Sequence, residues 1–149
     1  MRTFQAIVLF LAIVLFAGCR STAPSVKSVA EYKGRKLEYG SQGGITGGGT
    51  VISILETGQV FSATLTLASE SPTNETQHSQ SAAKDALALI NEGEALIKKH
   101  MDLSGTGNMT YFLVYHDGTT AHRISWPAEE FPPEDVRAFT KKVSTFIQK

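Results

Sequence analysis

Alternating apolar and polar positions run through much of the chain after residue 35 and predict β-strands. Residues 50–56 and 59–68 have a period of two, and the link Thr57-Gly58 favours a tight two-residue hairpin turn between them. In that register one face of the hairpin is apolar and carries Ile52, Ile54, Phe61, Ala63, Leu65 and Leu67. One apolar and one mixed face are typical of a half-buried antiparallel sheet. Before this hairpin, residues 36–39 predict a further short strand.

A second hairpin is predicted from residues 108–116 and 119–126. Asp117-Gly118 between them is a favoured type I′ turn. This turn places one set of side chains on a common face, namely Tyr111, Leu113, Tyr115, His122, Ile124 and Trp126. His116 then points to the opposite face from His122, because successive side chains alternate along a strand. The two histidines are therefore not expected to share a metal ion.

Two segments have helical rather than strand periodicity. Residues 82–101 predict a helix with Ala83, Ala86, Leu87, Ile90 and Ile97 on one face, weakened in the middle by Gly93. The sequence Pro132-Pro133-Glu134-Asp135 predicts the start of a last helix, since proline suits the first turn and acids suit the N-terminal dipole. Its apolar stripe is Val136, Phe139, Val143, Phe146 and Ile147.

These elements define the expected fold. The polar residues 69–81, which include Pro72, are predicted to be a loop. The order is then β-β-β-α-β-β-α, and we expect an α+β fold in which an antiparallel sheet of about five strands has both helices packed on one face. Residues 35–149 would form this single domain.

The N-terminus has a different pattern. Arg2 precedes an almost purely apolar run, residues 6–18, which is too short to span a bilayer as a helix. The run ends in Phe16-Ala17-Gly18-Cys19, and this sequence resembles the processing site of bacterial lipoproteins. There are two alternatives to a lipoprotein signal. The N-terminal segment could be cleaved without lipidation, or the apolar run could be a buried core helix.

The lipoprotein resemblance implies a division of the N-terminal region. Residues 1–18 would be a signal peptide, Cys19 would be acylated and bind the membrane, and residues 19–34 would carry the lipid and a flexible tether. Arg20 stands where an inner-membrane retention signal often has Asp, so we expect an anchor in the outer membrane, facing the periplasm.

Composition excludes several functions. The chain of 149 residues has 14 basic and 14 acidic side chains and no basic stripe, so we do not expect it to bind nucleic acid. Cys19 is its only cysteine, which excludes an internal disulfide. No Ser, His or carboxylate arrangement indicates a catalytic site, and no cofactor is implied. We therefore predict no enzyme. Trp126 with Phe131 is expected to pack in the core or at a hinge and not to form a ligand platform.

A glycine-rich stretch, residues 40–49, lies between two predicted strands. It lacks the Gly-Lys-Ser/Thr ending of a phosphate-binding loop, and no helix follows it. It is either a wide connection between strands or a recognition loop that exposes backbone groups. The residues of this possible binding loop are Gly43, Gly44, Gly47, Gly48 and Gly49.

One resemblance extends over most of the chain after Cys19. The run Gly43-Gly44-Ile45-Thr46-Gly47 after a strand, a late tyrosine-bearing hairpin, and Phe131-Pro132-Pro133-Glu134 before the last helix are similar to emfourin-type small inhibitors of thermolysin-like metallopeptidases. The resemblance implies peptidase inhibition.

The functional expectation combines these features. We expect a lipid-anchored cell-envelope lipoprotein whose non-catalytic domain binds another envelope protein of unknown identity. Two alternatives remain open, namely an inhibitor of a thermolysin-like metallopeptidase and a domain that binds a small molecule or a metal through its histidines and aromatic hairpin.

Overall fold

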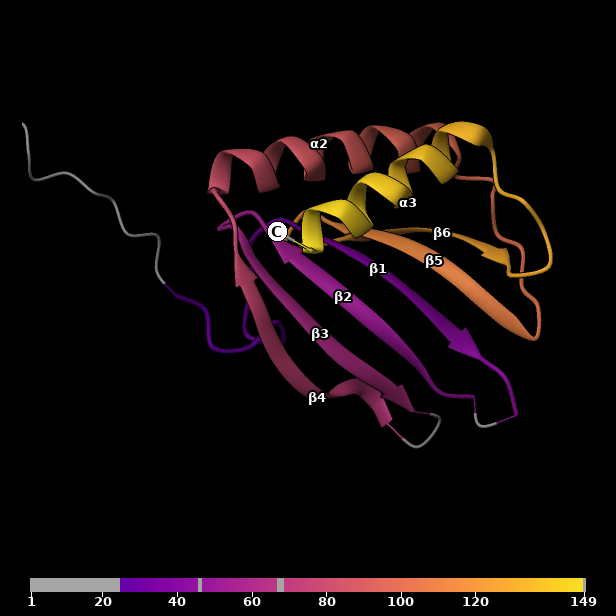
Figure 1. The fold of residues 1–149 in the computed structure, drawn as a ribbon, viewed down its shortest axis with the longest axis horizontal. Coiled ribbons are helices and arrows are strands. Elements are labelled where there is room, and N and C mark those ends of the chain that lie inside the picture. The colour runs from indigo at the N-terminus through magenta and orange to yellow at the C-terminus, as the bar shows by residue number, and fades with distance from the viewer. Residues whose placement is uncertain (1–24, 46, 67–68, 149) are drawn as a thin grey trace, which may run out of the picture.

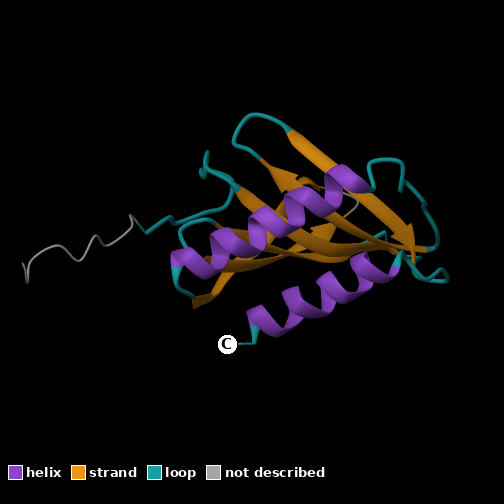
Figure 2. Cartoon of the chain, turned by 90° about the horizontal axis from the view of Figure 1, so that it is seen from above, coloured by secondary structure: helices purple, strands orange, loops and turns teal. Residues whose placement is uncertain are grey.

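Six antiparallel strands form one sheet in the order β4-β3-β2-β1-β5-β6 (Figure 1). The computed structural model describes residues 25–45, 47–66 and 69–148. Two helices cover one face of the sheet and leave the other face free of helices (Figure 2). The predicted α+β class and the packing of both helices on one face are confirmed. The elements are β1 Lys36–Gly43, β2 Gly49–Leu55, β3 Gln59–Thr66, β4 Ser69–Gln80, α2 Ala83–Lys99, β5 Met109–His116, β6 Ala121–Pro127 and α3 Glu134–Ile147.

Strand β4 was not expected, because residues 69–81 were predicted to be a loop. That prediction is wrong: β4 lies at the edge of the sheet and pairs with β3, for example Phe61 with Gln77 and Thr64 with Thr73. The register shifts three times along this pair, and Pro72 lies within the irregular part. An edge strand tolerates proline and needs no apolar alternation, so β4 has no periodicity that could be recognised in the sequence.

The β2–β3 hairpin differs from its prediction by one residue. Three residues, Glu56, Thr57 and Gly58, form the loop, with Gly58 N donating to Leu55 O (2.9 Å) at a positive φ of 90°. Ile54 therefore pairs with Val60 and not with Phe61. Because side chains alternate, a slip of one residue moves every side chain of β3 to the other face. The predicted shared face is thus wrong, and Leu67 lies outside the described residues.

The β5–β6 hairpin also has a longer loop than predicted, but its faces are correct. Residues 117–120 connect the strands, and Asp117 Oδ1 accepts hydrogen bonds from Thr119 N (2.9 Å) and Thr120 N (2.7 Å). His116 pairs with Ala121, so His116 and His122 lie on opposite faces as predicted. Two extra residues preserve the alternation, whereas one extra residue inverts it.

Both helices pack on the face that carries Leu37, Ile54 and Leu113. In α2 the buried residues are Ala86, Leu89, Ile90, Gly93 and Ile97, so the predicted positions Ala83 and Leu87 are wrong and both are exposed. A Cβ at Gly93 would lie 2.8 Å from Leu37 Cδ1 and 3.0 Å from Phe139 Cζ. Gly93, the glycine of α2, therefore faces Leu37 of the sheet and Phe139 of α3, and the helix is rotated relative to its prediction. The apolar stripe of α3 is as predicted, with Val136, Phe139, Val143 and Phe146 buried.

Candidate functional site

The glycine-rich stretch is a hairpin connection rather than a wide loop. Strand β1 continues to Gly43 and β2 begins at Gly49, so the strand predicted to stop at residue 39 is four residues longer. Gly43 N donates to Gly48 O (2.9 Å) and Gly47 N to Gly44 O (3.0 Å), which closes the connection tightly. The prediction that the stretch connects two strands is confirmed, but the connection is shorter than predicted. Of the five glycines proposed as a binding loop, only Gly44, Gly47 and Gly48 lie between the strands.

Three connections among the described residues lie at this end of the sheet, and we call them the loop end: the described residues of 44–48, 100–108 and 128–133 (Figure 1). Gly44 N donates to Asn108 O (2.6 Å), and Ala128 N donates to Met109 O (2.8 Å). Ile45 is fully exposed at 105% and Phe131 is 87% exposed. The loop end thus presents three exposed large apolar side chains, Ile45, Met101 and Phe131, and the connections that carry Ile45 and Phe131 are hydrogen bonded to the same short segment.

Phe131 does not pack with Trp126 as predicted. Trp126 is buried in the core and stacks on Tyr111 with 6.2 Å between ring centroids. Phe131 contacts solvent, with the Arg137 guanidinium 5.9 Å from the centre of its ring.

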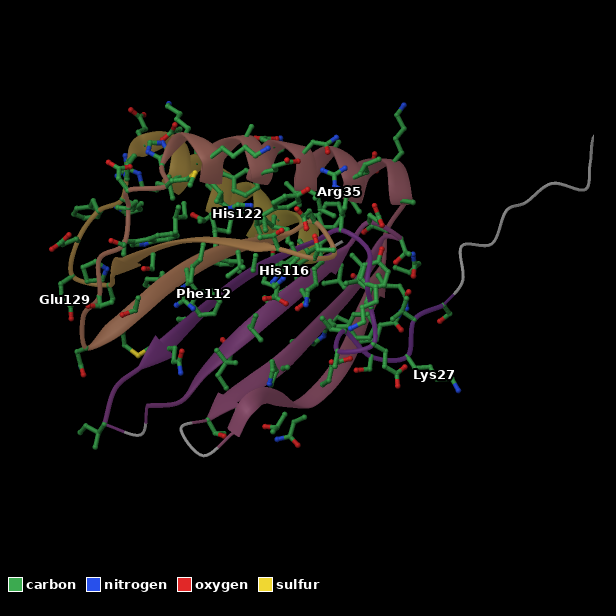
Figure 3. All side chains as sticks on the ribbon, turned by 180° about the vertical axis from the view of Figure 1, so that it is seen from behind. Lys27, Arg35, Phe112, His116, His122 and Glu129 are labelled. Carbon is green, nitrogen blue, oxygen red and sulfur yellow. The ribbon has the colours of Figure 1, made fainter. Side chains whose placement is uncertain are left out.

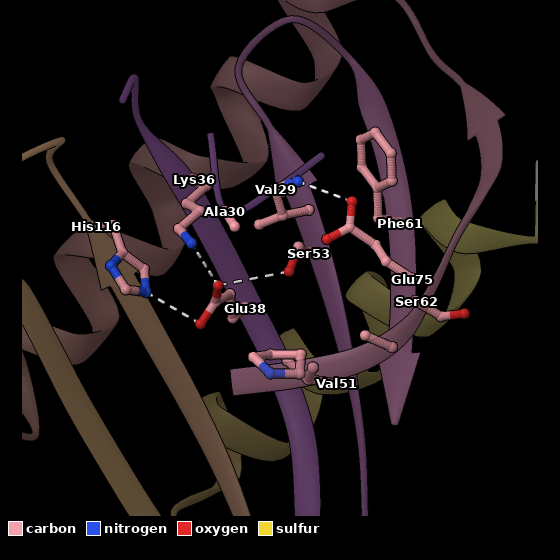
Figure 4. Close-up of a pocket in the computed structure, with 12 residues that line it drawn as sticks. Val29, Ala30, Lys36, Glu38, Val51, Ser53, Phe61, Ser62, Glu75 and His116 are labelled. Atoms are coloured by element: carbon pink, nitrogen blue, oxygen red, sulfur yellow. Dashed lines mark hydrogen bonds and ion pairs between the residues drawn. The ribbon is translucent and has the colours of Figure 1, made fainter. Parts of the chain in front are cut away.

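The face of the sheet without helices carries a partly buried carboxylate, Glu38. Glu38 accepts hydrogen bonds from Lys36 Nζ (2.7 Å), His116 Nε2 (3.0 Å) and Ser53 Oγ (3.5 Å) (Figure 4). Burial raises the pKa of Glu38, but the His116 hydrogen bond and the Lys36 charge lower it more strongly, to about 2. Glu38 is therefore ionised at neutral pH although its side chain is only 17% exposed.

Adjacent strands position this group without any loop. Lys36 and Glu38 are two residues apart on β1 and so point to the same face, and Lys36 pairs directly with His116 on β5. Farther along the same face, the Arg123 guanidinium lies 4.4 Å from the centre of the Phe112 ring. Figure 3 shows His116 and Phe112 along β5.

A cavity of about 310 Å³ opens beside Glu38. Much of its wall is apolar and includes Val29, Val51, Phe61 and Ala63. Its polar lining residues are Lys36, Glu38, Ser53, Ser62, Glu75 and His116. This combination of apolar walls with a few convergent polar groups is typical of sites that bind small molecules.

One wall of the cavity comes from the segment that precedes β1. We call residues 26–32 the strap. Gln59 holds its start, accepting from Val26 N (2.9 Å) and donating to Val26 O (2.9 Å). Glu75 Oε1 accepts from Val29 N (2.8 Å), and Val29 is buried with Leu55 and Phe61. Residues 19–34 were predicted to carry a flexible tether, whereas the strap within this range is held against β3 and β4.

Three of the four histidines contact polar side chains of other residues. His100 lies 3.0 Å from Asp135, His116 lies 3.0 Å from Glu38, and His78 lies 2.5 Å from Ser62 Oγ. Within the part of the chain that the structure describes, no group of three or more His, Cys, Asp or Glu side chains could hold a metal ion. Cys19 and the predicted signal peptide lie outside the described residues.

Lys36, Glu38 and Glu75 were not predicted as site residues from the sequence. The spacing of Lys36 and Glu38 was a usable signal, since two charged side chains on one face of a strand need partners or water. Their partner His116 is 78 residues away from Glu38, and Glu75 lies on a strand that was predicted as a loop. Neither could be placed without the order of the strands.

No protein-family model matches the chain, and no match is found among curated proteins. Among the described residues, no helix combines the length and apolarity needed to cross a membrane. The resemblances to lipoproteins and to emfourin-type inhibitors therefore rest on the sequence motifs alone.

Proposed function

We propose that this protein is a lipid-anchored envelope lipoprotein whose non-catalytic domain binds another protein through the loop end. The observation that carries the proposal is the pair Ile45 and Phe131, which are exposed at 105% and 87% on neighbouring connections. Large apolar side chains on tightly hydrogen-bonded connections lose little conformational entropy on binding, and such anchors often dominate the energy of an interface.

The direction in which the chain enters the domain supports the same surface. The strap contacts the first residue of β3 and the β2–β3 loop, which lie at the opposite end of the sheet from the loop end. Figure 3 places Lys27, in the strap, and Glu129, in the loop end, at opposite ends of the molecule. A lipid on Cys19 would then leave the loop end facing away from the membrane and accessible to a partner.

Peptidase inhibition is a narrower form of this proposal. Two of the motifs that carry the emfourin resemblance, residues 43–47 and 131–134, lie at the same end of the fold although they are far apart in the sequence. A surface that contains both could enter the active-site cleft of a thermolysin-like enzyme.

The test is to cross-link the tagged full-length protein in intact cells and identify the proteins that co-purify. Cys19→Ala is the unanchored control. Ile45→Ser with Phe131→Ser should abolish capture of the partner, while the matched control Leu87→Ser removes a partly exposed leucine from α2 and should not. Alanines at the glycines are unsuitable probes, because a Cβ at Gly49 would lie 1.9 Å from Ser41 O.

Two outcomes would contradict the proposal. Capture of the same partner by the double variant would exclude the loop end as the binding surface. Failure of both wild type and Leu87→Ser to capture any protein would exclude specific binding. For the narrower form, a thermolysin-like peptidase whose activity is unchanged by excess wild-type protein would exclude inhibition of that enzyme.

A further inference from the structure

The charged side chains around the cavity beside Glu38 are unevenly distributed. Two carboxylates line it, Glu38 and Glu75, and the two basic side chains of the lining, Lys36 and His116, both contact Glu38. Apolar side chains form much of the remaining wall, and the hydroxyls of Ser53 and Ser62 also line it. The cavity therefore offers burial to a ligand with an apolar body, and the carboxylate of Glu75 attracts a positive end.

The two carboxylates differ in their partners. Glu38 is surrounded by Lys36, His116 and Ser53. Glu75 accepts hydrogen bonds only from neutral donors, Val29 N at 2.8 Å and Ser28 Oγ at 3.5 Å, and no ion pair joins it to a cationic side chain among the described residues. An ionised carboxylate has about four acceptor positions. Glu75 therefore retains acceptor positions and lacks a counter-charge.

The geometry brings these groups to one space. Figure 4 shows Glu38 and Glu75 on either side of the cavity with Ser53 between them, and the ring of Phe61 beside Glu75. A protonated amine between Glu75 and Ser53 would have one charged and one neutral acceptor, while its carbon chain packed on Val29, Val51 and Ala63.

We propose that this cavity binds a small primary amine with an aliphatic body, and that the Glu75 carboxylate is the acceptor for its ammonium group. An anionic ligand would instead meet Glu38 and Glu75, and a neutral one would leave Glu75 without a counter-charge. The site is separate from the loop end, so it adds a small-molecule site to the proposed protein-binding surface.

The experiment uses the full chain in lipid nanodiscs, with methyl-labelled valine and alanine, and three matched probes: hexylamine, hexan-1-ol and hexanoate. Methyl signals of Val51 and Ala63 report binding inside the cavity independently of any partition into the lipid. Hexylamine should shift both signals saturably and bind about tenfold more tightly than hexan-1-ol, the effect expected of a charge-assisted hydrogen bond. Hexanoate should produce no saturable shift.

Glu75→Gln keeps the shape and the acceptor for Val29 N but removes the charge, and should lower the hexylamine affinity about tenfold, to that of hexan-1-ol. Glu92→Gln, on the far side of α2, is the matched control and should leave the affinity unchanged. Ala63→Val narrows the cavity and should weaken both the amine and the alcohol.

Equal affinity for hexylamine and hexan-1-ol, tighter binding of hexanoate, or no saturable shift with any probe would each overturn the proposal. Unchanged hexylamine binding by Glu75→Gln would also overturn it.

Discussion

At the scale of single residues, Glu38 is the most constrained ionisable group of the helix-free face. It is partly buried, ionised and held by Lys36 of the same strand and His116 of the neighbouring strand. Removing one partner of a buried charge group is costly, because the remaining charges lose their compensation. Glu38 therefore ties β1 to β5 on the face where no helix supplies apolar contacts.

Glu38 should make the stability of the fold depend on pH. Its pKa is lowered from 4.5 to about 2 in the folded chain, so its contribution is fully present above pH 4.5 and is lost as the pH falls towards 2. We expect Glu38→Gln to lower the free energy of unfolding by about 3 kcal/mol at pH 6. The difference from wild type should shrink between pH 4.5 and 2.

Urea denaturation at a series of pH values measures this effect. Glu92→Gln is the control, because the exposed Glu92–Lys142 pair should contribute no more than about 1 kcal/mol at any pH. A difference for Glu38→Gln that is constant from pH 6 to pH 2 would contradict the role of the Glu38 charge.

At the scale of elements, loop length decided which sequence predictions succeeded. Both hairpins have longer loops than their dipeptide signals indicated. The β5–β6 loop is longer by two residues, so the predicted faces of Tyr111 and Trp126 are right. The β2–β3 loop is longer by one residue, so Phe61 points away from the helices, where it packs with Val29 of the strap.

The strap is an element that the sequence did not predict. Its polar composition suggests a tether, but its two valines match a small apolar cluster of the sheet, formed by Leu55 and Phe61. The strap packs on this face because the three-residue β2–β3 loop places Phe61 there, in contact with Val29.

Val29→Asp should release the strap. Burying a valine contributes roughly 1.5–3 kcal/mol, and a loss of about 1.4 kcal/mol raises the population of the released strap tenfold. We therefore expect limited trypsin digestion after Lys27 to be about tenfold faster or more. Glu31→Ala changes an exposed strap residue and is the control. Mass spectrometry of the first fragment measures the rate, and equal rates for Val29→Asp and wild type would show that the strap is not held by this contact.

At the scale of the whole molecule, the strap and the loop end occupy opposite ends of the sheet. Strand β1 spans this distance with eight residues, about 26 Å at the usual rise per residue. If Cys19 carries a lipid, the end that holds the strap faces the bilayer.

This orientation can be measured by energy transfer to a dye in the membrane. Labels on Ile45→Cys and Thr57→Cys mark the two ends of the sheet, since Tyr32 of the strap donates to Glu56 beside Thr57. Energy transfer to the membrane dye should be stronger from the label at Thr57→Cys than from the label at Ile45→Cys. Cys19→Ala should reduce the energy transfer from both labels. Equal transfer from the two labels, or stronger transfer from Ile45, would contradict the proposed orientation.

The candidate sites differ in how much the sequence could indicate. The glycine connection was recognisable because glycine is concentrated in one stretch, and Phe131 was noted beside the two prolines before the last helix. The cavity was not recognisable, because its residues come from the strap and from strands whose order places β1 between β2 and β5. No local pattern encodes that order, since the pairing of Lys36 with His116 joins residues 80 positions apart.

The sequence by itself determined the features that depend on neighbouring residues: the type of most elements, the apolar stripe of α3, the faces of the β5–β6 hairpin, and the α+β class with both helices on one face. Only the tertiary structure decided the register of β2–β3, the strand β4, the rotation of α2 about Gly93, and the cavity under the strap. Periodicity along the chain reports which side of an element is apolar, whereas edge pairing, close packing and buried charge groups depend on partners that are distant in the sequence.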